Sequence, residues 1–461
     1  GSSITGSGTT TMIGFLALAF AGIPMIQKLG LTLALGIFCI LVATLLAEPI
    51  IILLGERLLV RGNGIKKRKE KQKAGKAAKG NMLLGRYTGF VIGRPGLVMI
   101  FVLLLTGAAF VGATRMYVGP MDYSDILPEG HPEIDALSYL GNEFGTAGDS
   151  IQIVIETDPQ VFGSNEPRDI RTPEIVAYSE VISNKIGGLQ NVVQVTDVSG
   201  LLKSYNNGRL PKTSTGIIGI MSGDFPGGQN PFENYVDDEY TFAVIMVSLE
   251  DMNDDLSGEF VSDVRNILSE TPQPAGIKVG VAGDAVMSEE IMALVGPTLQ
   301  STSMFSLIGI LVVVVLMFMS VRKGLISLLG LVFGIVWTYG LIGFYGLSLT
   351  SATSGSISMV MGVGIDFGIQ MVNRFRQERE KSGLEGSLKT ILNSTFPPMM
   401  ITTLAALIGF RAMTFSEISI MADLGNIMSL GIMSCFLAAV LVIPVILVFA
   451  EKLGGYMNRG V

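Results

Sequence analysis

The sequence is poor in the residues that build disulfide-stabilised, metal-binding and ordinary soluble proteins. Among 461 residues there are two cysteines and one histidine, His131, and charged residues make up only 15%. Two cysteines exclude a disulfide framework or a thiolate metal cluster, and a single histidine excludes a histidine-rich metal site. Soluble chains ordinarily carry about 25% charged residues. The deficit argues against a wholly soluble protein, and we expect no metal and no cofactor.

Long apolar runs stand where charge is missing. Hydrophobic residues make up 49% of the chain, and the mean hydropathy is +0.54. A helix needs about 20 residues to cross the hydrocarbon core of a bilayer. The stretches that reach or approach this length are Leu29–Leu54, Gly96–Ala113, Met304–Met319, Leu325–Phe344, Ile357–Val372 and Leu424–Phe449. Two further stretches, Ile4–Ala21 and Met399–Phe415, are less apolar, and hydropathy alone does not settle them.

An internal repeat identifies these two stretches as spans. When the sequence is shifted by 395 positions, Gly14 falls on Gly409. Pro49 falls on Pro444 in the same alignment. Roughly 17 of 46 aligned positions are identical, where chance gives about three. The chain thus starts and ends with the same helix pair, and we predict a membrane α-helical bundle of about eight spans.

The repeat also predicts that the chain is part of a two-unit protein. Between Arg86 and Leu453 we expect one span, an inserted domain and then five spans. If the terminal helix pair completes a six-span unit, the first unit lacks its first four spans and its own domain. The expected partner is therefore the missing N-terminal repeat of the same protein. A half-size protein that works as a homo-oligomer is the alternative.

Charge is distributed unevenly along the chain. From Asp122 to Glu290 there are 29 acidic and 8 basic side chains, whereas the whole chain has a net charge of −7. The basic residues elsewhere lie beside the apolar runs, which is the positive-inside pattern of a multi-pass protein. We predict a location in the cell (cytoplasmic) membrane with the acidic segment extracytoplasmic. The basic cluster Lys66–Lys79 is either a solvated linker or a site for anionic lipid headgroups.

The acidic segment has the pattern of a small α+β domain. The expected strands are Ile151–Glu156, Val192–Val198, Phe242–Leu249 and Ile277–Ala282, and the expected helices are Pro173–Lys185 and Leu256–Ser269. The residues from 206 to 239 are rich in Gly, Pro and Asn and predict a long excursion. The order β-α-β-β-α-β is typical of a ferredoxin-like unit. Such a fold does not by itself specify a function.

A single carboxylate, Asp366, interrupts the span Ile357–Val372. A charged side chain at the bilayer centre costs about 2.5–3.5 kcal/mol by insertion scales, so Asp366 should face the bundle interior. Helical spacing places it on one stripe with small and polar residues, which allow a neighbouring helix to approach closely. The stripe consists of Gly355, Ser358, Gly362, Asp366 and Asn373. Asp366 is either a proton-relay or ion-coupling site, or a statically paired carboxylate near the inner interface.

The residues around Asp366 resemble a known signature. Gly362 to Gln370, with Gly364, Phe367 and Gly368 inside it, is similar to the fourth-span motif of the resistance–nodulation–division (RND) superfamily. The stretches 9–18 and 29–49 resemble its fifth and sixth spans. The similarity is closest to the hydrophobe/amphiphile exporters, a branch that includes mycobacterial large membrane proteins, hopanoid exporters and Patched-like sterol-sensing proteins.

The resemblance implies twelve spans in two pseudo-repeats, two porter domains and export driven by proton flux. In that scheme Asp366 matches the relay aspartate of the second repeat. The equivalent motif of the first repeat is not in this chain, so these residues alone do not build a complete relay.

The sequence and the resemblance together predict a secondary active transporter rather than an enzyme. No paired catalytic carboxylates, Ser/His/Asp set or metal ligands stand out, and nothing predicts nucleotide or nucleic-acid binding. We expect export of hydrophobic or amphiphilic molecules or lipids, driven by the proton-motive force, with membrane lipids as further partners. The alternatives are a lipid- or sterol-binding regulatory membrane protein and an accessory factor in protein secretion.

The expected organisation has five parts. These are residues 1–60 as the last two spans of the first repeat, 61–93 as a basic cytoplasmic linker, 94–121 as the first span of the second repeat, 122–296 as the extracytoplasmic porter-like domain, and 297–455 as a five-span, sterol-sensing-like bundle.

Overall fold

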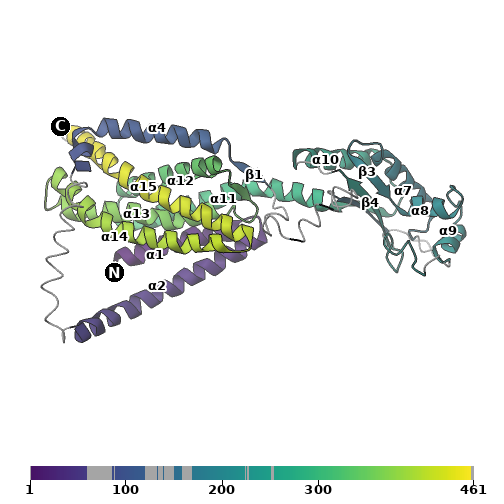
Figure 1. Cartoon of the computed structure of the whole chain (residues 1–461), viewed down its shortest axis with the longest axis horizontal. Coiled ribbons are helices and arrows are strands. Elements are labelled where there is room, and N and C mark those ends of the chain that lie inside the picture. The colour runs from purple at the N-terminus through teal and green to yellow at the C-terminus, as the bar shows by residue number, and fades with distance from the viewer. Residues whose placement is uncertain are drawn as a thin grey trace. The chain divides into compact units, whose positions relative to one another are not determined.

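The chain forms two compact units in the computed structural model, which describes residues 2–59, 86–119, 132, 139, 150–157, 169–250 and 254–457, except 88, 224, 226 and 227. The first unit, here the helical unit, comprises Gly1–Pro128 with Leu294–Val461, and the second, the α/β unit, comprises Glu129–Ala293 (Figure 1). The cluster Lys66–Lys79 and His131 lie outside the described residues.

A helix lies at each of the predicted spans. These helices are α1 (Ser2–Leu16), α2 (Pro24–Leu59), α4 (Pro95–Ala113), α11 (Asp284–Phe318), α12 (Val321–Tyr345), α13 (Ser356–Arg379), α14 (Leu384–Ala412) and α15 (Ser419–Met457). Within the described residues, six helices are long and apolar enough to cross a membrane. Helix α1 has only 15 described residues and α13 carries Asp366 and a charged C-terminal end, and these two are not among the six.

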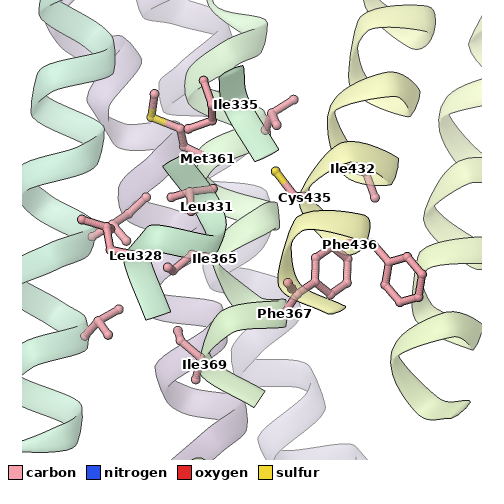
Figure 2. Close-up of a cluster of buried hydrophobic side chains, with 14 of the residues drawn as sticks. Leu328, Leu331, Ile335, Met361, Ile365, Phe367, Ile369, Ile432, Cys435 and Phe436 are labelled. Atoms are coloured by element: carbon pink, nitrogen blue, oxygen red, sulfur yellow. The ribbon is translucent and has the colours of Figure 1, made fainter. Parts of the chain in front are cut away.

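Helix α13 lies against α1, α12, α14 and α15. On the sides shown in Figure 2, its apolar residues pack against α12 and α15. The rings of Phe367 and Phe436 meet edge to face at 5.7 Å. A Cβ added to Gly368 would lie 2.5 Å from the backbone oxygen of Ser327 in α12, so only glycine permits this approach.

The two helix pairs related by the sequence repeat have the same local geometry. A 3-10 helix, η1 (Ala17–Phe20), joins α1 to α2, and η2 (Met413–Phe415) joins α14 to α15. Gly30 lies against the Phe15 carbonyl, with 2.8 Å between that oxygen and a Cβ built on the glycine. Gly425 lies in the same way against the Phe410 carbonyl, at 2.5 Å.

Helix α14 begins at Leu384, before the apolar stretch Met399–Phe415 that the sequence marks as a span. Pro397 and Pro398 both lie inside this helix. Helices of membrane proteins tolerate proline because neighbouring helices and Ser or Thr side chains satisfy the freed backbone groups.

The α/β unit is a four-stranded sheet covered by helices. Its elements are β2 (Ser150–Thr157), α7 (Pro173–Ile186), β3 (Val192–Thr196), α8 (Val198–Tyr205), α9 (Ser214–Met221), β4 (Phe242–Leu249), α10 (Asp254–Glu270) and β5 (Ile277–Gly283). The strand order is β3-β4-β2-β5, and all neighbouring strands are antiparallel. Alternate residues of β2 are buried, because Ile151, Ile153 and Ile155 point into one core with residues of α7 and α10.

The sequence did not predict several short elements. Helices α8 and α9 lie in or beside the predicted excursion, and a two-stranded parallel pair joins β1 (Tyr117–Gly119) to β6 (Ser348–Thr350). Asp197 caps the start of α8, and its buried carboxylate accepts hydrogen bonds from Ser179 Oγ and Ser199 Oγ, both at 2.6 Å, and from the Gly200 N–H at 2.9 Å. A cap of this kind stabilises a helix start but carries little signal in the hydrophobic pattern.

Candidate functional site

The Asp366 carboxylate faces hydroxyl groups of α1. Ser7 Oγ donates a hydrogen bond to Asp366 Oδ2. Thr10 Oγ1 lies 3.5 Å from Asp366 Oδ1, within donating reach, and 2.8 Å from the Ser7 carbonyl of its own helix, which competes for the same proton. Ser7 and Thr10 are three residues apart and therefore share one face of α1. The carboxylate thus lies between two helices that are about 360 residues apart in the chain.

Helix α1 reaches Asp366 because two glycines allow close backbone contact. A Cβ on Gly14 would lie 2.5 Å from Gly362 Cα, and a Cβ on Gly362 would lie 3.1 Å from the Thr11 oxygen. Thr11 Oγ1 also donates a hydrogen bond of 3.0 Å to the Gly362 carbonyl. Small residues and hydroxyl bonds across helices are the usual means of helix association in membranes.

Two of the three arginines at the end of α13 form ion pairs with glutamates. Arg374 pairs with Glu378 at 3.1 Å, and Arg379 pairs with Glu451 of α15 at 2.6 Å. Within the described residues, Asp366 forms no salt bridge, so its polar contacts are the two hydroxyls. Hydroxyls accept as well as donate, and they remain compatible with either a charged or a neutral carboxyl group.

The structure divides the predicted stripe. Gly362 and the backbone oxygen of Ser358 lie against Gly14 of α1, and Gly355 lies against Leu18 and Ile26. Asp366 faces the same helix at Ser7 and Thr10. Ser358 is fully buried, and its Oγ has no hydrogen-bond partner within the described part of the chain.

Asn373 lies elsewhere on α13. With Gln370, Arg374 and Gln377 it lines a polar hollow of about 420 Å³ whose other side is Ser394, Thr395 and Pro398 of α14. The first part of the stripe therefore lies against α1, η1 and α2, and its last residue, Asn373, faces a hollow that α14 also lines.

The other residues of the family motif pack rather than contact the carboxylate. Gly364 lies against Cys435 of α15, and Gly368 lies against Ser327 of α12. Phe367 packs against Phe436 (Figure 2). They hold α13 in place on the sides away from α1.

Sequence reasoning missed the hydroxyl partners of Asp366. Ser7, Thr10 and Thr11 stand in a run of Gly, Ser and Thr from 6 to 11, inside a segment otherwise read as a weak span. Such a run in an apolar helix signals a contact with another helix. Among the described residues, no group of three or more His, Cys, Asp or Glu side chains is placed to hold a metal ion.

Comparison with known proteins gives a consistent set of relatives. The model of the MMPL family matches residues 1–105 and 233–458. Putative membrane protein MJ1562 of Methanocaldococcus jannaschii is 26% identical over 372 residues, which cover 80% of this chain and 94% of that protein.

Two relatives with transport names are longer than this chain. The siderophore exporter MmpL5 of Mycobacterium tuberculosis is 23% identical over 54% of this chain and 26% of its own length. The hopanoid transporter HpnN of Rhodopseudomonas palustris is 29% identical over 21% of this chain and 11% of its own length. The chain thus matches only about a quarter or less of these two proteins.

A solved structure shares the fold. SecDF, a translocon-associated membrane protein from Thermus thermophilus, superposes with a TM-score of 0.50 at 15% identity, covering 98% of this chain and 48% of that one. At this identity the likeness concerns the fold alone.

Proposed function

The chain belongs to the MMPL family of the RND superfamily, a family of membrane transporters rather than enzymes, and on that premise we propose that it forms the proton-coupling half of an exporter for hydrophobic or amphiphilic lipids. The observation that carries the proposal is the Asp366 carboxylate, held between α13 and α1 by hydroxyls and without a cation among the described residues.

Protonation of Asp366 changes how tightly α1 and α13 hold each other. Hydrogen bonds to an ionised acceptor are about twice as strong as those between neutral groups. The charged form therefore favours the close arrangement with Ser7 and Thr10, and the neutral form weakens it. A proton that enters from one side and leaves to the other biases which helix packing is populated.

In this proposal the α/β unit is the porter domain. The order β2-α7-β3-β4-α10-β5 and the strand order β3-β4-β2-β5 support a ferredoxin-like porter domain. The charge distribution supports an extracytoplasmic position. We place eight spans in the membrane, counting α1 and α13, because both pack against apolar helices of the same bundle.

The proposed exporter includes a second relay helix. Gly14 of α1 packs against Gly362, but among the described residues nothing lies within 4 Å of a Cβ built on its repeat equivalent, Gly409 of α14. We propose that a helix equivalent to α13, from another six-span unit, packs on this face of α14. A second copy of this chain suits the face poorly, because α1 already covers the matching face of its α13.

Lipid analysis of a deletion strain tests the substrate class. Strains lacking the full-length protein should accumulate an amphiphilic lipid inside the cell and lose it from the outer surface, and the wild-type gene should restore both pools. An unchanged lipid profile with a defect in protein secretion would contradict the proposal and favour the accessory role.

A further inference from the structure

Tyr87 fills a gap in the hydrogen bonding of α15. Pro444 lies inside that helix and has no N–H, so the carbonyl four residues earlier, that of Val440, lacks its helical partner. Tyr87 donates its hydroxyl proton to this carbonyl at 2.9 Å. Val91 is buried one turn further on, against Val98 and Val445. The segment 86–93, which precedes α4, is thereby fixed on the side of α15.

An apolar groove lies beside this segment. It has a volume of about 310 Å³ and is lined by Tyr87, Phe90, Leu97, Val98, Phe101 and Leu441. The Tyr87 hydroxyl proton is already committed to Val440, so the lining offers an occupant no free hydrogen-bond donor. The part of an occupant that enters the groove is therefore hydrocarbon.

Two arginines stand next to the lining residues in the sequence. Arg86 precedes Tyr87, and Arg94 lies between Phe90 and Leu97; both are exposed. Neither forms a salt bridge with any residue in the described ranges. The basic cluster Lys66–Lys79 precedes them in the chain, and clusters of this kind next to a membrane helix attract anionic lipids.

We propose that this groove is a binding site for an anionic phospholipid of the cytoplasmic leaflet. One acyl chain lies along Phe90, Leu97 and Phe101, and the phosphate is bound by Arg86 and Arg94. The lipid is a resident ligand at the edge of α4 and α15, distinct from cargo. The proposal does not depend on the role of Asp366.

Photo-crosslinking tests the site in the full-length protein. The probe is phosphatidylglycerol with a diazirine in one acyl chain, dilute in phosphatidylcholine vesicles, and the crosslinked peptides are identified by mass spectrometry. We expect label on residues 86–101 and around Leu441, with competition by unlabelled phosphatidylglycerol. Arg86→Gln and Arg94→Gln should each lower that label about five-fold, the effect of one basic residue near an anionic membrane surface.

Matched variants separate the groove from ordinary boundary lipid. Leu97→Trp fills the groove and should remove the label, whereas Leu104→Trp, at another lipid-facing position of α4, should leave it unchanged. Arg115→Gln, at the opposite end of α4, should also have no effect. An equal signal from a phosphatidylcholine probe, a label spread evenly over the outer helices, or a label insensitive to these variants would overturn the proposal.

Discussion

Ser7 and Thr10 give Asp366 its polar surroundings, and they belong to α1, which is about 360 residues before Asp366 in the sequence. A carboxylate that depends on two hydroxyls is sensitive to each of them, because a lost donor leaves the charged form less stabilised. The sequence located the carboxylate through its cost in the membrane, but it could not locate these donors, because the contact is made in three dimensions.

Removing the hydroxyls should weaken coupling. Ser7→Ala and Thr10→Val should lower export by the full-length protein several-fold and move its pH profile to higher pH, since the charged carboxylate loses a donor worth about 1.5–3 kcal/mol. Thr9→Val is the matched control, because the Thr9 hydroxyl bonds to the Thr5 carbonyl instead. Export rates measured over a range of pH decide the matter; a pH profile identical to that of Thr9→Val would count against the role of these hydroxyls.

Asp237 gives the α/β unit a pH-dependent element. Burial acts to raise the pKa of Asp237, but hydrogen bonds from Thr241 Oγ1 and the Phe242 N–H, both 2.6 Å, outweigh it and hold the pKa below its ordinary value. A depressed pKa gives stability that is present above the unfolded pKa of about 3.9 and is lost as pH falls through the folded pKa.

Hydrogen exchange at the Phe242 amide measures this effect. Corrected for intrinsic rates, protection should fall in the wild type as the pH drops below about 4. Asp237→Asn should show weaker protection at neutral pH and little further loss in acid. A wild-type protection that does not change in acid would show that the carboxylate does not stabilise this turn.

At the scale of elements, glycine contacts set how closely the helices pack. Gly14→Val places a side chain where the Gly362 backbone lies, while a side chain at Gly409 meets no residue of the described part of the chain. In this 461-residue chain Gly14→Val should therefore lower stability by about 1–3 kcal/mol, the usual cost of overpacking, and Gly409→Val should be neutral. Thermal unfolding in detergent distinguishes them, and equal effects would refute the packing described for α1.

The same pair of variants bears on the proposed second unit. In the full-length protein Gly409→Val should also be harmful, since its position then faces another helix. Stability there as good as the wild type would contradict a second relay helix on α14.

The predicted strands and helices match the structure where the hydrophobic period and the length of a stretch indicate the same element. The strand expected at Ile151–Glu156 and the helix expected at Pro173–Lys185 both match the structure, as β2 and α7. The sequence prediction missed the part of α14 before Met399, which is richer in polar residues, and it missed α8, α9 and the β1–β6 pair, which are too short to carry a periodic signal.

At the scale of the whole molecule, charge predicts the orientation in the membrane. In a Cys39→Ala, Cys435→Ala background, a cysteine in place of Lys278 should react with an impermeant maleimide in intact cells. A cysteine in place of Glu380, exposed at the end of α13, should react only after lysis. The reverse pattern would place the acidic unit inside the cell.

The central claim is that reversible protonation of Asp366 drives export. The most direct test measures lipid export by the full-length protein carrying Asp366→Asn or Asp366→Glu, with the proton gradient and the sodium concentration varied separately. We predict that Asp366→Asn inserts normally but does not export, that Asp366→Glu keeps part of the activity, and that wild-type export follows the proton gradient and ignores sodium at fixed pH. Normal export by Asp366→Asn would make the carboxylate structural, and export that follows sodium would contradict proton coupling.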